Sequence, residues 1–494
     1  MFKVTQNNLR WWVLLTVIIG TFLGRLDQTI VNLALPKMMD TFSITVSSAG
    51  WIATSYILAN AVFVPIWGKL GDTIGRKKVY IIGFSIFILG SVLAGFAWSL
   101  SSMIVFRVIQ AIAGSADYPT AMAILAVTFK EGKERAQALG IWSVSFAAAS
   151  VFGPLLGGPL IDNFGWRSVF LINLPIGIIG ILMAMRFINE SKVATKSKFF
   201  DWWGALTLGG SLSSLVLILD KGLDWGWTSV AAMICYFITI VLLGLFIKIE
   251  QRAREPIVDL KFFKIPAFVN ALLNNFVVFM GMMGSLFLLP VFAQTFLGYT
   301  ATESGYLFMP MAFMMVIASP LGGSLVGKVQ ARYVIFASTI IAAIGTFMFM
   351  GIDPKSTALD IIIPLMVMSF GLGLGMSQRT SIIASVVDPH EIGIASSVLA
   401  LARNIAGAFG IAIFGTILNN SIKDNVLKIS HFSNISTHNP LIINQYIGLI
   451  ELKAQVSAYA NVFFFAGLVI FIGAFASLYL KVKNERTDIK VHVE

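Results

Sequence analysis

The sequence predicts an all-α polytopic membrane protein. Hydrophobic residues make up 57% of the 494 positions and charged residues only 12%, whereas a soluble domain has roughly 45–50% apolar and 25% charged residues. Apolar stretches of about 20 residues, long enough to cross the hydrocarbon core of a bilayer, follow one another with short polar breaks. Lipid is therefore expected to be the main solvent, and no sizeable soluble domain is predicted.

Windows of about 20 residues predict roughly fourteen transmembrane helices. Their centres lie near residues 22, 58, 88, 114, 148, 178, 212, 238, 280, 314, 342, 370, 406 and 468. This spacing predicts a six-helix bundle over residues 1–190, a linker with two extra transmembrane helices over residues 191–264, and a second six-helix bundle over residues 265–494. The last part includes an outer loop over 419–455, with a surface helix around Leu441–Val456, and a short tail.

Basic residues sort to one side of the predicted spans, and the positive-inside rule makes that side cytoplasmic. An even number of spans then places both termini in the cytoplasm. The clusters on that side include Lys3 with Arg10, Arg76–Lys78, Lys130–Arg135, Lys192–Lys198, Lys248–Lys264 and the tail from Lys481. The net charge of +11 is spread over these short clusters. We therefore expect a lipid bilayer of the plasma membrane, and not nucleic acid, as the partner.

Two ionisable residues in the predicted spans lie at similar depth. Asp27 lies about 24 Å along the first span, and Arg107 lies a few residues into the fourth, which runs in the opposite direction. Charged groups in lipid are costly, so those that are present are candidates for a functional site. We expect Arg107 to be the partner of Asp27. The pair could be static, could take part in proton coupling, or could do both.

Asp117 lies about 15 Å deeper than Arg107, near the middle of the bilayer, and no basic residue is near it in the sequence. An unpaired carboxyl group in that position suits a site that loads and releases protons. The alternative is an aspartic acid that stays protonated and hydrogen-bonds to a neighbouring helix. Arg403, beside Asn404 in the thirteenth span, could bind an anionic group, pair with Asp117 or anchor packing.

The connection after the second span combines glycines, an acid and a basic cluster. It runs from Gly68 through Asp72 and Gly75 to Arg76 and Lys77. Such a segment is usually a solvated turn. Asp72 could also cap the positive N-terminus of a helix in the other half, and that contact would act as a cytoplasmic gate.

Small residues recur every four positions in the fifth span. Ala149, Gly153 and Gly157 line one face and allow another helix to approach closely. Pro154 removes a backbone donor and kinks the helix there. Gly158 directly follows Gly157 in the sequence. The arrangement is compatible with ordinary packing and with a hinge between two halves.

We predict that soft apolar side chains and a few polar groups form the substrate cavity. The candidate cavity residues are Gln110, Tyr118, Asn275, Met280, Arg403 and Asn404. No catalytic residues, metal ligands or cofactor are predicted, because the four histidines lie in loops or the tail and no ATP-binding P-loop is present. The proton gradient is the expected energy source, and a monomer is the expected state.

Four motifs resemble those of the major facilitator superfamily, and specifically its fourteen-span drug:proton antiporters. They are Leu26–Pro36 in the first span, Gly68–Lys78 after the second, Arg107–Gln110 in the fourth, and Gly153–Pro159 in the fifth. The resemblance covers almost the whole chain. Trp166–Arg167 before Asn173–Pro175 is also typical of this branch.

This resemblance implies the major facilitator fold and bacterial multidrug efflux. It also implies proton coupling through Asp27 and Arg107, a cytoplasmic gate at Asp72 and Arg76, and antiport through the fifth-span motif. The chain departs from the family at Ala111 and Ala113, which replace glycines after the fourth-span arginine. Spans nine to fourteen also show no clear mid-span acid, which disfavours dicationic substrates.

The resulting prediction is a proton-coupled antiporter that exports amphipathic drugs or other small toxic molecules by alternating access. Export of one dedicated metabolite, such as a siderophore, an amino acid or a lipid-like compound, is an alternative. Uptake by proton symport is a further possibility, although the fifth-span motif argues against it. A non-transporting membrane receptor would need an effector domain, and the composition leaves no room for one.

Overall fold

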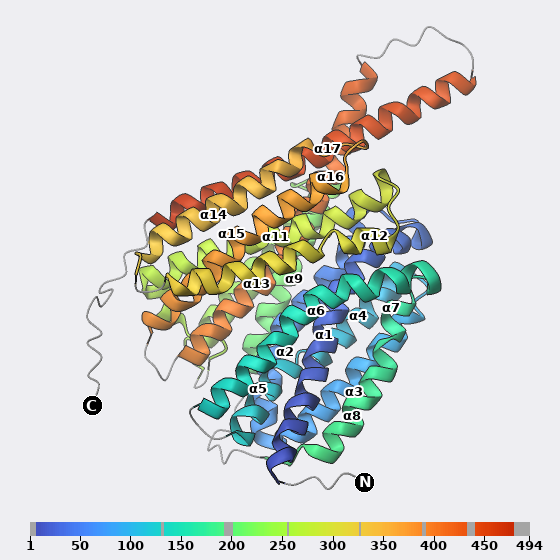
Figure 1. The fold of residues 1–494 in the computed structure, drawn as a ribbon. Coiled ribbons are helices and arrows are strands. Elements are labelled where there is room, and N and C mark those ends of the chain that lie inside the picture. Colours follow the sequence, from blue (N-terminus) through green and yellow to red (C-terminus); the bar gives the residue numbers. More distant parts are fainter. Residues whose placement is uncertain are drawn as a thin grey trace. The chain divides into compact units, whose positions relative to one another are not determined.

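The computed structural model describes residues 6–129, 133–191, 201–253, 256–325, 328–387, 392–431 and 440–478. Within these ranges every regular element is a helix, which confirms the all-α prediction (Figure 1). The chain divides into two compact units. Unit 1 comprises Met1–Ile257 with Leu289–Met309, and unit 2 comprises Val258–Leu288 with Pro310–Glu494. The three-part division drawn from the sequence remains a prediction.

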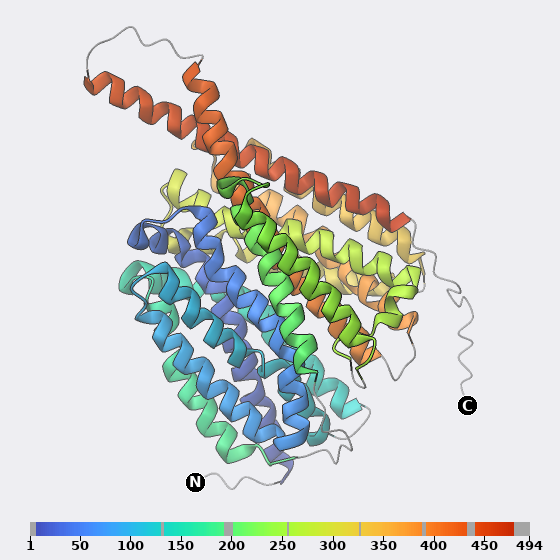
Figure 2. The ribbon, with the colours of Figure 1, turned by 180° about the vertical axis from the view of Figure 1, so that it is seen from behind.

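Unit 1 consists of helices that pack side by side. The elements are α1 (Gln6–Phe42), α2 (Val46–Ile74), α3 (Arg76–Gly95), α4 (Leu100–Gly114), α5 (Asp117–Thr128), α6 (Lys133–Phe164), α7 (Ser168–Leu171), α8 (Asn173–Phe187), α9 (Trp202–Trp225), α10 (Val230–Glu250) and α12 (Ala301–Tyr306). Helix α1 contacts α6 and α8, α3 contacts α4 and α8, and α12 packs on α6. Helices α9 and α10 lie side by side (Figure 2), and α9 packs on α2.

A buried apolar cluster fixes α1, α3, α5, α6 and α8 against one another in unit 1. Its members include Val17, Tyr80, Leu125, Trp142 and Ala184, one from each helix. These helices supply many of the polar residues described below, so the cluster sets the positions of their backbones.

Unit 2 contains the second set of long helices. The elements are η1 (Leu260–Lys264), α11 (Pro266–Phe296), α13 (Met309–Ser324), α14 (Ala331–Met348), η2 (Phe349–Gly351), α15 (Ala358–Ser385), α16 (Ile392–His431) and α17 (Pro440–Leu478). The last residues of α11 and the first of α13 belong to unit 1. Helix α14 packs on both α15 and α17, and α16 packs on α17.

Twelve helices in the described part of the chain are long and apolar enough to cross a membrane. All fourteen predicted centres fall in helices, but two of these helices are not among the twelve. The centre near residue 114 falls where α4 and α5 meet, and each of these helices is short. Pro119 cannot donate a hydrogen bond to the carbonyl of Ser115, so the helix breaks there. The centre near residue 148 falls in α6. The side chains of several α6 residues lie outside the described part of the chain, and α6 is not counted among the twelve. The number fourteen and the location of the termini remain predictions.

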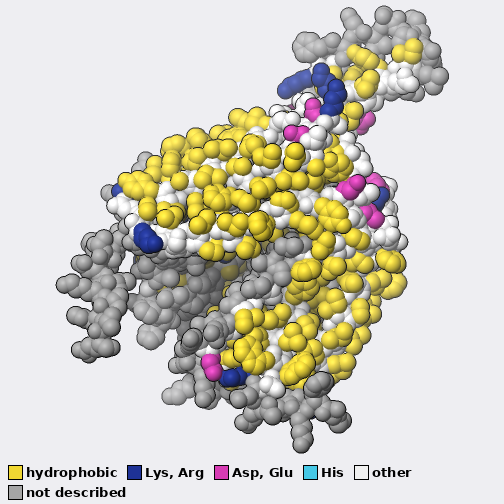
Figure 3. Space-filling model, in the orientation of Figure 1, with side chains coloured by type: hydrophobic (Ala, Val, Ile, Leu, Met, Phe, Trp, Pro, Cys, Tyr) yellow, Lys and Arg dark blue, Asp and Glu magenta, His cyan; other side chains and the backbone are white. Residues whose placement is uncertain are grey.

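The described surface is strongly apolar. Exposed apolar side chains on the helices include Leu89, Val105, Leu182, Ile240 and Phe313. Figure 3 shows apolar side chains covering most of the described surface in that view, with charged side chains near the ends of helices. An apolar exterior of this extent fits helices that face hydrocarbon.

The stretch 419–455 is mostly helical, so the expectation of a loop there is corrected. Helix α16 continues to His431 and α17 begins at Pro440, and both extend beyond the other helices of unit 2 (Figure 1). The expected surface helix over Leu441–Val456 is the first part of α17. No Gly or Pro interrupts residues 416–439, and polar residues alone do not end a helix.

Candidate functional site

Asp27 and Arg107 form an ion pair that is buried inside unit 1. Arg107 Nη1 lies 2.6 Å from Asp27 Oδ2, and the side chains are 2% and 0% exposed for Arg107 and Asp27, respectively. The residues come from α4 and α1, as their similar depths predict. The structure therefore confirms the pairing, while its part in proton coupling remains a prediction.

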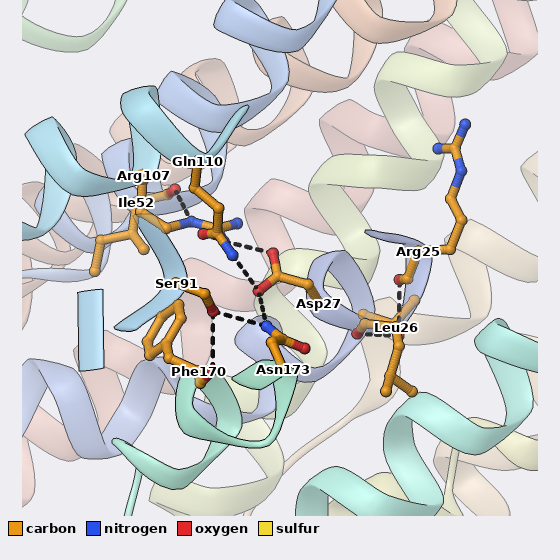
Figure 4. Close-up of polar contacts among 10 residues, drawn as sticks. Arg25, Leu26, Asp27, Ile52, Ser91, Arg107, Gln110, Phe170 and Asn173 are labelled. Atoms are coloured by element: carbon orange, nitrogen blue, oxygen red, sulfur yellow. Dashed lines mark hydrogen bonds and ion pairs between the residues drawn. The ribbon is translucent and has the colours of Figure 1, made fainter. Parts of the chain in front are cut away.

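Two amide side chains complete the surroundings of the Asp27 carboxylate (Figure 4). Gln110 Nε2 donates to Asp27 Oδ1 over 2.9 Å, and Asn173 Nδ2 donates to the same oxygen over 3.0 Å. Asn173 Nδ2 also lies 2.8 Å from Ser91 Oγ, and Ser91 in turn donates to the carbonyl of Phe170. Donors from α4 and α8 thus converge on one carboxylate of α1.

Other groups hold the Arg107 guanidinium in place. It donates to Gln110 Oε1 over 2.7 Å and to the carbonyl of Ile52 over 3.4 Å. Its central carbon lies 4.1 Å from the centre of the Tyr56 ring, within reach of a cation–π interaction. Ile52 and Tyr56 belong to α2 and Ser91 to α3, so the Asp27 network joins α1, α2, α3, α4 and α8. Breaking one partner of such a buried pair would leave an uncompensated charge.

Asp117 lies in a second, separate polar group of unit 1. It is the first residue of α5, directly after the break that follows α4. Thr21 Oγ1 donates to Asp117 Oδ2 over 2.7 Å, and Trp142 Nε1 donates to Thr21 over 2.9 Å. Asp117 Oδ1 is buried and has no hydrogen-bond partner. Asp117 therefore has far fewer donors than Asp27.

The connection after α2 is much shorter than predicted. Gly68 and Asp72 lie within α2, and only Gly75, at φ 116°, separates α2 from α3. This expectation of a loop is wrong, because the glycines of α2 accept helical geometry. The side chain of Asp72 lies outside the described residues, so the predicted gate remains a prediction.

A carboxylate that the sequence did not single out caps the start of α3. Glu190 accepts hydrogen bonds from the backbone amides of Lys77 and Lys78 over 3.1 and 3.3 Å. Arg76 Nη1 donates to the carbonyl of Ala123, and Lys77 Nζ to that of Met185. A Cβ on Gly75 would contact Glu190, so glycine permits this approach.

The fifth-span motif packs α6 against α1 and α12. Gly153 faces Thr29 of α1, where a Cβ would collide with the hydroxyl. A Cβ on Gly158 would collide with the backbone of Thr302, and one on Gly305 would lie 2.5 Å from the carbonyl oxygen of Pro154. The close-packed face predicted for Gly153 and Gly157 is therefore present, and it has two partner helices.

Asp162, one turn after this motif, binds the first turn of α12. Asp162 accepts hydrogen bonds from the amide of Ala301 over 3.1 Å, from the amide of Thr302 over 2.9 Å and from its hydroxyl over 2.6 Å. Burial raises the pKa of Asp162, but these hydrogen bonds outweigh it and leave the pKa below its ordinary value. The contact ties the end of α6 to α12.

The remaining predicted cavity residues lie in two places. Gln110 belongs to the Asp27 network, and Tyr118 is exposed and packs on Trp142 with ring centres 5.3 Å apart. Asn275, Met280, Arg403 and Asn404 belong to unit 2. There Arg403 Nε donates to Asn275 Oδ1 over 3.3 Å, and its guanidinium lies 5.0 Å from the Phe279 ring centre. The backbone of Met280 packs against Gly410, and Asn404 is half-buried.

Sequence comparison relates this chain to bacterial transporters. Residues 17–411 match the family model described as Major Facilitator Superfamily. Multidrug resistance protein Stp of Mycobacterium tuberculosis is 33% identical over 84% of this chain and 76% of its own length. Multidrug transporter protein MdtP of Bacillus subtilis is 33% identical over 85% of this chain and 77% of its own length. The riboflavin transporter RibZ of Clostridioides difficile is 29% identical, over 97% and 99% of the two chains.

Comparison of structures gives the same fold. The crystal structure of a bacterial homologue of the human lysosomal transporter Spinster, in an inward-facing and occupied conformation, matches with a TM-score of 0.69. The two chains are 17% identical, and the match covers 95% of this chain and 96% of the other. The chain is therefore a multi-pass transporter of the cell membrane rather than an enzyme, and it belongs to the Major Facilitator Superfamily.

Proposed function

We propose that this transporter exports small amphipathic molecules in exchange for protons. Relatives named for multidrug resistance and multidrug transport support the export of varied compounds. The carboxyl groups of Asp27 and Asp117 support proton exchange, since few other ionisable groups lie inside the described helices of unit 1. Each elementary charge that crosses the membrane gains about 2.3 kcal/mol per 100 mV, so one proton per cycle can drive export against a concentration gradient.

Asp117 is the observation that carries this proposal. Its Oδ1 is buried without a partner, and its Oδ2 accepts only the Thr21 hydroxyl. A neutral carboxylic acid suits this position better than an ion, because an unpaired charge in lipid is costly. An added proton on Oδ1 would remove the charge and leave the bond from Thr21 intact. Asp117 is therefore the group we assign to proton loading.

Asp27 has a different part in the proposal. Its carboxylate is matched by one guanidinium and two amide donors, an arrangement that suits the charged form. A proton on Asp27 would release Arg107, which keeps its bonds to Gln110 and Ile52. We assign Asp27 and Arg107 to the coupling step that rearranges α1 and α4 when the site changes its protonation state.

The gate and the antiporter motif complete the proposed cycle. Gly68, Asp72, Gly75, Arg76 and Lys77 form the proposed cytoplasmic gate. The fifth-span motif packs closely on two partner helices. This packing supports the proposal that the motif restricts the conformational change of alternating access when no substrate is bound.

A transporter dedicated to one metabolite is the second candidate. The observation that favours it is the similarity to a riboflavin transporter, which extends over nearly the full length of both chains. An exporter of varied compounds moves chemically unrelated molecules, whereas a dedicated one moves only close analogues.

Inside-out vesicles with an acidic lumen test both candidates. We expect the parent protein to accumulate several of three fluorescent probes, ethidium, riboflavin and pyrenebutyrate, and the Asp117→Asn variant to accumulate none. Accumulation of riboflavin alone would favour the dedicated transporter. Undiminished accumulation by both Asp117→Asn and Asp27→Asn would refute the assignment of the proton sites.

A further inference from the structure

Unit 2 contains a fully buried arginine that donates to two neutral side chains. Arg379 of α15 is 1% exposed. Its Nε donates to Asn274 Oδ1 over 2.7 Å, and its Nη2 donates to Thr339 Oγ1 over 2.8 Å. Arg107 in unit 1 has a carboxylate beside it, whereas no carboxylate of the described residues bonds to Arg379. A buried cation that has only neutral partners in the described part of the chain is expensive, so its presence calls for an explanation.

A second arginine lies close to the first. The charges of Arg403 and Arg379 act on each other electrostatically. Arg403 is half-buried and donates to Asn275, which is fully buried beside Asn274 on α11. Asn275 Nδ2 is buried and has no hydrogen-bond partner. An unused amide donor next to a guanidinium leaves a place for an acceptor atom.

These groups meet near one end of their helices. Asn274 and Thr339 lie about 12 Å from the first residues of α11 and α14, and Arg379 lies about 9 Å before the last residue of α15. Arg403 lies about 17 Å into α16. The positive charges are therefore concentrated in one layer of unit 2.

The acidic residues described in unit 2 lie away from this layer. Asp259 is paired with Lys261 at 3.1 Å, and the others lie in a connection or far along their helices. These others are Asp353, Asp360, Asp424 and Glu451. Along α15, Asp360 lies about 28 Å from Arg379, and along α16, Asp424 lies about 32 Å from Arg403. Asp388 and Glu391 lie outside the described residues.

We propose that Arg403 and Asn275 bind the acidic group of a transported small molecule, with Arg379 behind them as a second, fixed positive charge. A carboxylate, sulfonate or phosphate would accept from Arg403 and from the unused Asn275 amide. Phe279, whose ring lies against Arg403, would contact the apolar part of the same molecule. The substrates thus include amphipathic anions. This inference rests on the proposed export function and specifies the class of its cargo.

A pair of probes that differ only in charge tests the proposal. Pyrenebutyrate carries a carboxylate, and pyrenebutanamide is its neutral counterpart. Binding is measured on the purified full chain in phosphatidylcholine nanodiscs. We expect the parent protein to bind pyrenebutyrate about tenfold more tightly than the amide, and Arg403→Gln to lose this preference. Arg403→Lys should keep part of it. Arg332→Gln, which removes a charge from the start of α14 in the same unit, should keep it in full.

Three outcomes would overturn the proposal. Equal binding of the two probes by the parent protein would do so, as would an unchanged preference in Arg403→Gln. Displacement of pyrenebutyrate by phosphatidylglycerol in the nanodisc would identify a lipid headgroup as the natural occupant. The export function is judged separately. If one of these outcomes is found and the parent protein still accumulates ethidium when driven by protons, the export function stands and this inference alone fails.

Discussion

Replacing Asp162 by alanine should loosen the first turn of α12. The carboxylate accepts hydrogen bonds from two backbone amides and from the Thr302 hydroxyl. The amides at a helix start have no partner within the helix, so their loss exposes unsatisfied donors. The bonds between Thr300 and Glu303 remain and keep part of the turn in place.

The expected size of the effect follows from comparable helix caps. Loss of a capping side chain costs about 1 kcal/mol, and the solvent exposure of Asp162 argues against a larger value. Local opening of α12 should therefore become about fivefold more frequent. Because the pKa of Asp162 is lowered in the folded protein, the contact stabilises the turn above the ordinary aspartate range. It is lost only as the pH falls through the lowered pKa, so the effect should be constant between about pH 6 and pH 8.

Hydrogen exchange followed by mass spectrometry measures this opening. The peptide that contains Ala301 and Thr302 should exchange about fivefold faster in Asp162→Ala than in the parent at the same pH. Asn163→Ala is the matched control, because Asn163 bonds only to the carbonyl of Pro159 in its own helix. Equal exchange in parent and Asp162→Ala, or an equal increase in the control, would refute the reasoning.

Three further substitutions test other contacts of unit 1. Gly158→Val should force α6 and α12 apart, which should cost about 1–3 kcal/mol of stability and reduce transport. Gly24→Ala is the control, because a Cβ there meets nothing within 4 Å, and it should change neither thermal stability nor transport. Asn173→Leu should lower the free energy of unfolding by about 1.5–3 kcal/mol, since it removes a donor to a buried carboxylate; an unchanged denaturation midpoint would contradict this. Glu190→Gln removes a negative charge from the start of α3. The loss of its interaction with the helix N-terminus should cost about 0.5 kcal/mol, so amide hydrogen exchange at the start of α3 should become about twice as fast. No faster exchange than in the parent would argue against this cap.

Much of the fold could be predicted because hydrophobic patterning determines it. Runs of about 20 apolar residues located every long helix, and the depth of Asp27 and Arg107 along antiparallel spans predicted their contact. The helical extension of α16 to His431 was not predicted, since polar sequence is common to loops and to helices outside the bilayer. The early end of α4 follows from Pro119, and that residue could have located it.

The site was only partly predictable, because neutral polar residues give little signal in a single sequence. Asn173 and Ser91 complete the Asp27 network, yet amides and hydroxyls are common in membrane helices. Arg379 was missed because it lies just beyond the most apolar part of its helix. An arginine in that position is typical of the interface between membrane and water. Asp162 and Glu190 act on partners distant in sequence, and no periodicity connects them.

The central claim is that transport is exchange with protons through Asp117. The direct test uses proteoliposomes with a pH-sensitive dye in the lumen and no initial pH gradient. A compound that the parent protein exports is added outside, and its entry should make the lumen alkaline as protons leave. Asp117→Asn should abolish the signal, whereas Asp162→Asn should retain it. Acidification, or an undiminished signal in Asp117→Asn, would contradict the account.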